Sequence, residues 1–430
     1  MKRQLFFLLL AASLLCACKQ VAPNSPDDPQ DTTQVTPPDT TQLGTMRQPV
    51  PMSFNSAEEQ LLYRTGEFTL NLTGLICQNP DKDNIIISPL SASLMLGMLM
   101  NGADGETLAQ MQQALGFEGL QQSEINDWYK QLIETLPTLD TVSIVKIANA
   151  IWVQNDFPVL PEFVDVNRSF FNATADNVNM KDPATADRIN QWAANNTNDL
   201  IKNVVNPRDI ENCVMVLANA LYFRSRWAAP FDPSFTHRSD FDPLNGSRIK
   251  PETMEGELYA PYAVTPAGQL LELDYKSHRY CMDILLPDKD KDIRQVLADL
   301  TSSDWNSMIE QLNYNLVLVR MPKFKLKYDR ALTNVLKAAG MPRALTPAAE
   351  FPYLSPVPTY LDWVKQACYL AVDEDGTEAA AVTIGGDYAT SAEPEPIIEF
   401  FVNRPFFLVI REKQKGNILF TAMITNPEAE

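Results

Sequence analysis

Apolar positions at helical spacing mark the first regular part of the chain. Between residues 61 and 76 they recur at intervals of three and four, and Ser56 with Glu59 forms a capping-box pattern just before them. Ser88-Pro89 opens a second helix, whose body over residues 92–100 is apolar on every side. A helix that is apolar all round is normally buried. The pattern therefore predicts one amphipathic helix followed by a helix in the core.

Strand-like runs become common further along the chain. Residues 214–223 are apolar on both faces, which is typical of a central strand covered on both sides, and residues 315–328 alternate as one long strand. Helices early in the chain and strands late, without strict alternation, indicate an α+β fold. Further strands are predicted at 85–87, 142–153, 406–410 and 418–424, with two within 269–287, and further helices at 108–115, 186–200, 293–312 and 329–340.

Residues 373–383 combine two signals that ordinary loops do not carry together. A run rich in aromatic and β-branched residues leads in from Tyr360 to Val372, and Gly376 then interrupts it. Mostly small residues follow as far as Ile384. Such a segment fits an exposed loop or the crowded interior of a sheet, and the pattern alone leaves both open.

Composition limits the classes of partner. A chain of 430 residues with 45% hydrophobic content can bury the core of one large domain or of two ordinary ones. Its formal net charge is −19. A surface that acidic repels nucleic acid and attracts basic proteins at long range, so we expect protein partners and no nucleic acid.

The N-terminus predicts export. Lys2 and Arg3 precede an apolar run that is typical of a signal peptide and too short for a permanent membrane span. Leu15-Cys16-Ala17-Cys18 resembles a bacterial lipobox, which implies a lipoprotein signal peptide over residues 1–17 and lipidation of Cys18. That implies a lipid-anchored protein of the bacterial cell envelope, at the outer membrane or the cell surface; the alternative is a plain secretory signal and a secreted protein. Residues 18–52, rich in Pro, Thr and Asp, are predicted to form a disordered tether.

The sequence carries no motif of a conventional enzyme. It holds no HExxH, no GxSxG and no Gly-rich phosphate loop before a helix, and His237 and His278 are its only histidines. We therefore predict no catalytic residues, no metal and no cofactor. Four cysteines beyond the leader are expected to be buried thiols, with disulfide pairing as the alternative for an exported protein: Cys77, Cys213, Cys281 and Cys368.

Six motifs stand in the order found in the serpin family, and the chain from about residue 56 to Pro427 resembles that family through them. Any one of them is short, but six in the family's order are specific. The resemblance implies a serpin domain over residues 53–430. The motifs are residues 84–91 (NIIISPLS), 102–107 (GADGET), 217–223 (LANALYF) followed by Trp227 and Phe231, 321–324 (MPKF), 373–381 (DEDGTEAAA) and 403–406 (NRPF).

The resemblance implies an α+β fold of three β-sheets and eight to nine helices, with an exposed reactive-centre loop at about 374–397. It also implies a monomeric protease inhibitor with a metastable fold. A serine protease, or a cysteine protease, attacks the loop as a substrate, forms an acyl-enzyme, and is trapped when the cleaved loop inserts into the main sheet.

Residue roles follow from the same resemblance. Gly376 permits the backbone change at the hinge, and Thr377 is the first side chain to enter the sheet. A histidine that is usual where the sheet opens is replaced by Gln366, which cannot titrate. The implied hinge is Glu374, Gly376, Thr377, Glu378, Ala379, Ala380, Ala381 and Val382. The implied breach and shutter are Trp227, Lys323, Ser88, Ser91, Asn219 and Gln366, with an ion pair between Lys323 and Glu374.

The family's usual spacing from Glu374 places the reactive bond between Thr390 and Ser391. Tyr388 and Ala389 are alternatives, because the loop is a few residues longer than is typical. Thr or Ala before the bond suits elastase-like or subtilisin-like proteases, and Tyr suits chymotrypsin-like ones. The sequence has no Lys or Arg between Glu374 and Arg404, so trypsin-like targets are not expected.

Two rival functions stay open. A non-inhibitory serpin would act as a surface binding or decoy protein whose loop is cleaved without trapping, although the small residues after Thr377 favour inhibition. A lipoprotein that binds small solutes or glycans would need an aromatic-lined pocket and no metastable loop.

Overall fold

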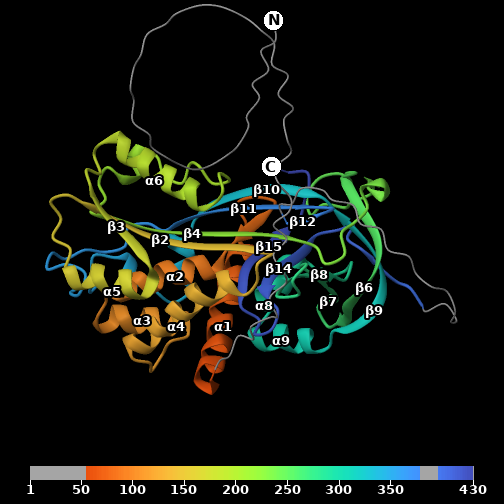
Figure 1. Cartoon of the computed structure of the whole chain (residues 1–430), viewed down its shortest axis with the longest axis horizontal. Helices are drawn as coiled ribbons and strands as arrows, with labels where there is room; N and C mark the ends of the chain where they lie inside the picture. The colour runs from red at the N-terminus through yellow and green to blue at the C-terminus, as the bar shows by residue number, and fades with distance from the viewer. Residues whose placement is uncertain (1–54, 378–395, 430) are drawn as a thin grey trace, which may run out of the picture.

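The computed structural model describes residues 55–377 and 396–429, and the statements below concern those residues (Figure 1). No helix among them is long and apolar enough to cross a membrane. The α-helices are α1 (Ser56–Gln78), α2 (Pro89–Met100), α3 (Gly105–Leu115), α4 (Gln122–Thr135), α5 (Pro161–Phe171), α6 (Pro183–Asn196), α7 (Pro207–Ile210), α8 (Ile293–Asp299), α9 (Ser302–Glu310) and α10 (Thr333–Ala338); short 3-10 helices are η1 (Leu136–Thr138), η2 (Pro233–Phe235) and η3 (Arg343–Leu345).

The described strands form two hydrogen-bonded sheets. The six-stranded sheet has the order β10-β11-β12-β4-β2-β3, and the nine-stranded sheet has the order β1-β15-β14-β8-β7-β6-β9-β13, with β5 paired to β6. The strands are β1 (Ile85–Ile87), β2 (Ile144–Gln154), β3 (Ala173–Val178), β4 (Met215–Arg226), β5 (His237–Arg238), β6 (Glu252–Thr265), β7 (Gly268–Asp274), β8 (Tyr280–Pro287), β9 (Asn313–Pro322), β10 (Phe324–Ala331), β11 (Lys365–Asp373), β12 (Gly376–Thr377), β13 (Ile398–Phe401), β14 (Phe406–Glu412) and β15 (Ile418–Ile424).

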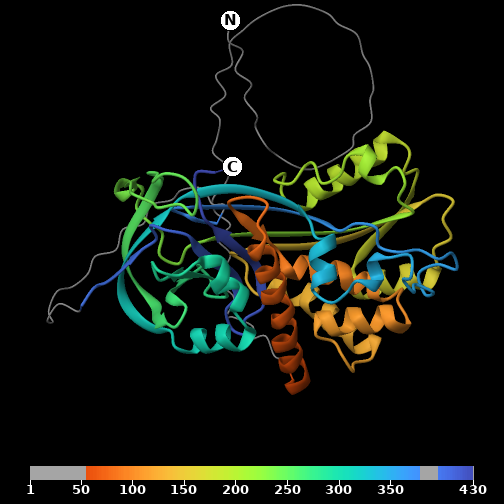
Figure 2. The same ribbon diagram turned by 180° about the vertical axis from the view of Figure 1, so that it is seen from behind.

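The six-stranded sheet runs across the middle of the molecule. Figure 1 shows α6 over one face of this sheet and α2 on the opposite side. Figure 2 shows α1 passing between the helical end of the molecule and the end formed mainly by strands. Ser88 caps α2 by accepting a hydrogen bond from the Ser91 amide, and eleven of the twelve residues of α2 are buried, as the all-apolar pattern predicts.

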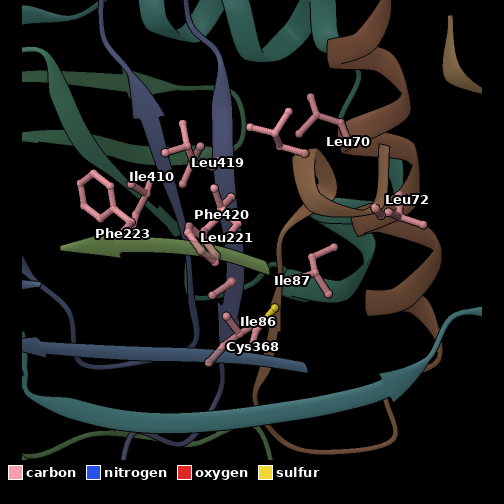
Figure 3. Packing of buried hydrophobic residues seen from close by; sticks show 14 of the residues in the cluster. Leu70, Leu72, Ile86, Ile87, Leu221, Phe223, Cys368, Ile410, Leu419 and Phe420 are labelled. Atoms are coloured by element: carbon pink, nitrogen blue, oxygen red, sulfur yellow. The ribbon is translucent and has the colours of Figure 1, made fainter. Parts of the chain in front are cut away.

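The two sheets share one core. Figure 3 shows Leu221 and Phe223 of β4 close to Ile410 of β14 and to Leu419 and Phe420 of β15. Each such side chain stabilises the fold by about 1.5–3 kcal/mol when it is fully buried. The β14–β15 hairpin therefore packs against the core-facing side of the six-stranded sheet at β4.

The structure confirms the α+β class and corrects several details. The three expected sheets appear as two, because the long strand β6 pairs with β9 over residues 253–262 and with β7 over residues 262–265 and so joins two groups of strands. The expected count of eight to nine helices becomes ten α-helices in the described residues. The predicted cap of the first helix shifts by one residue, since Asn55 and Glu58 exchange the two capping hydrogen bonds.

Two predicted elements are each divided in the structure. The run at 315–328 forms β9 and β10, which belong to different sheets and separate at Lys323. The run at 293–312 forms α8 and α9, because Thr301 makes a capping box with Asp304 and starts a new helix. At the first break the buried positions change from odd to even numbers, and at the second the sequence Thr301-Ser302-Ser303-Asp304 is a capping-box pattern; both signs were missed.

A buried ionic cluster lies inside the nine-stranded sheet. The Arg411 guanidinium lies 2.6 Å from Asp283 and 2.5 Å from Glu272, and all three side chains are at most 5% exposed. Burial raises the pKa of Asp283 to about 6, although Arg411 acts in the opposite direction. The donor atoms of Glu272, Cys281 and Asp283 lie close enough to hold a metal ion, but the guanidinium already binds both carboxylates.

Replacing Arg411 by Met should lower the stability of the fold by about 3–5 kcal/mol, because Asp283 remains buried without its partner and Glu272 keeps only its ion pair with Lys413. The matched control is Arg248→Met at an exposed ion pair with Asp240 and Asp242, where a change below about 1 kcal/mol is expected. Denaturant midpoints of the two variants measure the difference. Equal midpoints would show that the buried cluster contributes no more to stability than the exposed ion pair of Arg248.

Candidate functional site

A two-residue strand sits in the middle of the six-stranded sheet. Gly376 of β12 pairs with Asp373 of β11 and with Arg226 of β4. Thr377 pairs in the same way with Val372 and Ser225. Within residues 55–377 and 396–429, these are the pairings that connect β4 to β11. The start of the predicted hinge therefore already lies inside the sheet.

Beyond Thr377, β4 and β11 flank a groove instead of pairing with each other. Three cavities of about 20, 80 and 480 Å³ follow one another along the two strands. Leu221 lines the first and second cavities, and Trp363 lines the second and third. The groove runs from Thr377 to the first residues of β4 and β11.

Gly376 is required by its contacts as well as by its conformation. Its φ angle is +151°, which side-chain-bearing residues rarely adopt. A Cβ atom at this position would lie 2.2 Å from the carbonyl oxygen of Ser225. The sequence motif explains this glycine by the backbone change expected at the hinge. The structure gives a second reason, because the backbone of β4 lies too close to Gly376 for any side chain.

Thr377 is buried between β4 and β11, at the end of the groove. It is 3% exposed, and its hydroxyl lies 2.5 Å from the Tyr275 hydroxyl. Trp227 stacks on Tyr275 with ring centroids 4.8 Å apart, and its indole N–H donates to the Asp373 carbonyl at 2.9 Å. The backbone N–H of Trp227 donates to the Asp375 carbonyl at 2.8 Å. The tryptophan thus ties the turn between β11 and β12 to the end of β4.

Lys323 and Glu374 form an ion pair at the same end of the sheet. The Lys323 ammonium lies 3.0 Å from Glu374 Oε1, and the Thr236 hydroxyl donates to the same oxygen at 2.7 Å. Burial alone would raise the pKa of Glu374, but these hydrogen bonds outweigh it and hold the pKa below its ordinary value. Glu374 is therefore ionised at neutral pH, and its contacts with Lys323 and Thr236 hold the turn between β11 and β12 in place.

The residues of the implied shutter divide between the two walls of the groove. The Gln366 amide exchanges two hydrogen bonds with the backbone of Ser88, at 3.1 and 2.8 Å, and the Ser88 hydroxyl accepts from the Ser91 amide. Asn219 lies on the other wall and donates to Asn149 at 2.7 Å. Its Oδ1 atom is buried and has no hydrogen-bond partner among the described residues. The structure thus joins Ser88, Ser91 and Gln366 but leaves Asn219 apart from them.

Part of the predicted site lies outside the described residues. This applies to the hinge positions from Glu378 to Val382, to Tyr388, Ala389, Thr390 and Ser391, and to Cys18 with the segments 1–17 and 18–52. Three residues of the site were not found from sequence. Asn149 interrupts an apolar strand and carried a weak signal, whereas Tyr275 and Thr236 carried none.

Comparison with known proteins decides the family. The family model described as Serpin (serine protease inhibitor) matches residues 63–427. The chain belongs to the serpin family. This serpin is 30% identical to human neuroserpin over 379 residues, which cover 84% of this chain and 90% of that protein. It is 29% identical to rat glia-derived nexin over 363 residues, which cover 82% of this chain and 90% of that protein.

A solved structure supports the same conclusion. The crystal structure of the thermophilic serpin tengpin in its native state matches with a TM-score of 0.79 and 29% identity, covering 88% of this chain and 97% of that one. The fold class and family expected from the sequence motifs are therefore confirmed. The family's general activity is inhibition of serine proteases.

The four cysteines of the described residues differ in burial. Cys77, Cys213, Cys281 and Cys368 are all free thiols, and three are buried while Cys213 is only half-buried, which corrects the expectation of four buried thiols. Burial raises the pKa of Cys77 and of Cys368 to about 12 and also raises that of Cys281.

Among these four, we expect Cys213 to react fastest with a thiol reagent in the native protein at pH 8, because the others are buried and inaccessible; burial raises the pKa of Cys213 too, so its partial exposure decides. Peptide mapping after brief alkylation identifies the labelled residue, and Cys213→Ser should remove that label. Labelling of Cys368 at the rate of Cys213 would contradict the described burial.

Proposed function

We propose that this serpin is a suicide-substrate inhibitor of serine proteases, in which the residues after Thr377 insert between β4 and β11. One observation carries the proposal: β12 pairs with both strands at one end of a groove that the same strands line. A chain that continued from Thr377 in this register would hydrogen-bond to both walls. Each backbone hydrogen bond of this kind contributes about 1 kcal/mol net.

The sequence after Thr377 suits that path. Extended by strand alternation from Thr377, the register of β12 would put Ala379, Ala381 and Thr383 on the face that Thr377 turns to the core, and Glu378 on the opposite face. Small side chains would thus enter the crowded side, and the carboxylate would stay on the outer side. This distribution favours insertion over the rival function of a non-inhibitory decoy.

The same extended register would bring Thr383 opposite Asn219 and Gln366. Asn219 Oδ1 has no partner among the described residues, and a threonine hydroxyl is a suitable donor. A buried acceptor without a partner costs about 1–3 kcal/mol, so insertion would remove that cost. The two walls of the shutter would then be joined through the inserted strand.

The proposed reactive bond is Thr390–Ser391, with Tyr388 and Ala389 as alternative positions before the bond. The absence of Lys and Arg between Glu374 and Arg404 supports elastase-like, subtilisin-like or chymotrypsin-like targets, and cysteine proteases are a further target class. Thirteen residue steps separate Thr377 from Thr390. At roughly 3.3 Å per residue the inserted strand would be about 43 Å long, enough to carry an attached protease across the domain.

We also propose that the inhibitor acts as a monomer at a bacterial cell envelope. The lipobox-like sequence ending at Cys18 supports a lipid anchor, and residues 18–52 supply a tether of low hydrophobicity between the anchor and α1. The anchor would hold the inhibitor at a membrane surface, where proteases reach it from solution.

Mixing the protein with elastase, subtilisin or chymotrypsin should give an SDS-resistant covalent complex with at least one of them, and trypsin should give none. Mass measurement of the released C-terminal peptide identifies the bond, for which we expect Ser391 as the new N-terminus. Cleavage by all three enzymes with full retention of protease activity would instead identify a decoy.

Thr377→Glu should convert the inhibitor into a substrate, because it places a carboxylate on the buried face beside Tyr275. The matched control is Glu378→Thr, which alters the next residue on the outer face and should leave complex formation unchanged. The ratio of complex to cleaved serpin on denaturing gels measures the effect. Equal ratios for the two variants would rule out insertion in the stated register.

A further inference from the structure

Tyr275 presents a buried hydroxyl that makes one polar contact with the hinge. The residue is fully buried, and burial raises the pKa of its phenol, so the group is a neutral hydrogen-bonding partner. That contact is with Thr377 Oγ1, at 2.5 Å. A buried hydroxyl left without a partner costs about 1–3 kcal/mol. The phenol therefore favours the position of Thr377 seen in the structure over any position outside the sheet.

The Tyr275 ring is held in place from several sides. Trp227 stacks on it with an interplanar angle of 6°, and Phe223 packs edge-on with ring centroids 5.0 Å apart. The Tyr275 amide donates to the Tyr280 carbonyl at 3.0 Å. These contacts do not involve Thr377, so the phenol keeps its direction whether or not the hinge is in place.

The backbone around Tyr275 is tied to the end of β4, which is one wall of the groove. The Ala228 amide donates to the Asp274 carbonyl and the Lys276 amide donates to the Arg226 carbonyl, both at 2.8 Å. The Asp274 carboxylate in turn binds Lys413, which extends from the end of β14. Tyr275 is thereby fixed relative to the strand with which Thr377 pairs.

We propose that Tyr275 is a positioning residue for loop insertion: its hydroxyl holds Thr377 at the first paired position, so that insertion begins from an end already bound. This inference rests on the proposed function. After acylation, insertion competes with hydrolysis of the acyl-enzyme. A hinge that is already paired at its first residue should raise the rate of insertion relative to the rate of hydrolysis.

Single-atom variants separate this role from core packing. Tyr275→Phe keeps the ring and its stack on Trp227 but removes the hydroxyl, and Thr377→Val removes the other partner with little change in shape. Thr377→Ser retains a hydroxyl and serves as the conservative rescue. Tyr280→Phe is the matched control, because it removes a buried phenol hydroxyl that bonds the Leu136 carbonyl instead of the hinge.

The experiment measures the stoichiometry of inhibition, the moles of serpin consumed per mole of protease inactivated, with a protease that the unaltered serpin traps. Tyr275→Phe and Thr377→Val should each raise the ratio of cleaved to trapped serpin, which is this stoichiometry minus one, about threefold to tenfold, the equivalent of one hydrogen bond. The double variant should be no worse than either single one. Thr377→Ser and Tyr280→Phe should match the unaltered serpin.

The inference is overturned if Tyr275→Phe behaves like Tyr280→Phe, or if the effects of Tyr275→Phe and Thr377→Val simply add. Hydrogen exchange of the peptide spanning residues 373–377 gives a second measurement that needs no protease. Faster exchange in Tyr275→Phe than in Tyr280→Phe supports the inference, and equal exchange overturns it. If the unaltered serpin traps no protease, the proposed function fails, and the exchange result still decides the role of Tyr275.

Discussion

Backbone hydrogen bonding inside the six-stranded sheet is the constraint on which this structure depends. Inner strands of a sheet normally pair along both edges, because a buried N–H or C=O without a partner is costly. Here β4 and β11 are joined through Gly376 and Thr377 in the described residues, and beyond them the strands line a groove. The sheet thus contains two facing edges that a further strand would satisfy, and one end of that strand is already present.

The other contacts of the site fall into two groups. One group lies around β12, and the other lies further along the groove, on its two separate walls. Trp227, Tyr275 and the Lys323–Glu374 pair fix the turn that leads into β12. Lower in the groove, Ser88 with Gln366 belongs to one wall and Asn219 with Asn149 to the other. Among the described residues, no hydrogen bond joins Ser88 or Gln366 directly to Asn219 or Asn149. A neutral Gln366 makes both of its contacts irrespective of pH, unlike a histidine.

Much of the fold followed from the sequence where hydrophobic pattern and burial agree. The all-apolar α2 and the β14–β15 hairpin were predicted because nearly all their residues lie in the core, and β4 was predicted because its central residues are apolar on both faces. The division between β9 and β10 was not predicted, because apolar residues stand on both sides of Lys323 and the change of the buried face from odd to even positions there was missed. The long strand β6 was missed because its exposed glutamates and buried apolar residues do not alternate cleanly.

The hinge could be located from its motif, but its contacts could not. Small residues after Gly376 indicated insertion, whereas the clash of a Cβ with Ser225 depends on a strand that is distant in the sequence. The same holds for Tyr275 and for the open acceptor on Asn219, which depend on neighbours that only the tertiary fold supplies. Motifs therefore located the predicted hinge, and the structure shows the groups that contact Gly376 and Thr377.

The most direct test of loop insertion is the thermal unfolding of the chain before and after a single cut in the segment between Glu374 and Arg404. Insertion adds a strand paired on both sides, and each backbone hydrogen bond contributes about 1 kcal/mol, so the cleaved chain should unfold at a markedly higher temperature than the intact chain. An unchanged or lower unfolding temperature after cleavage would contradict insertion between β4 and β11.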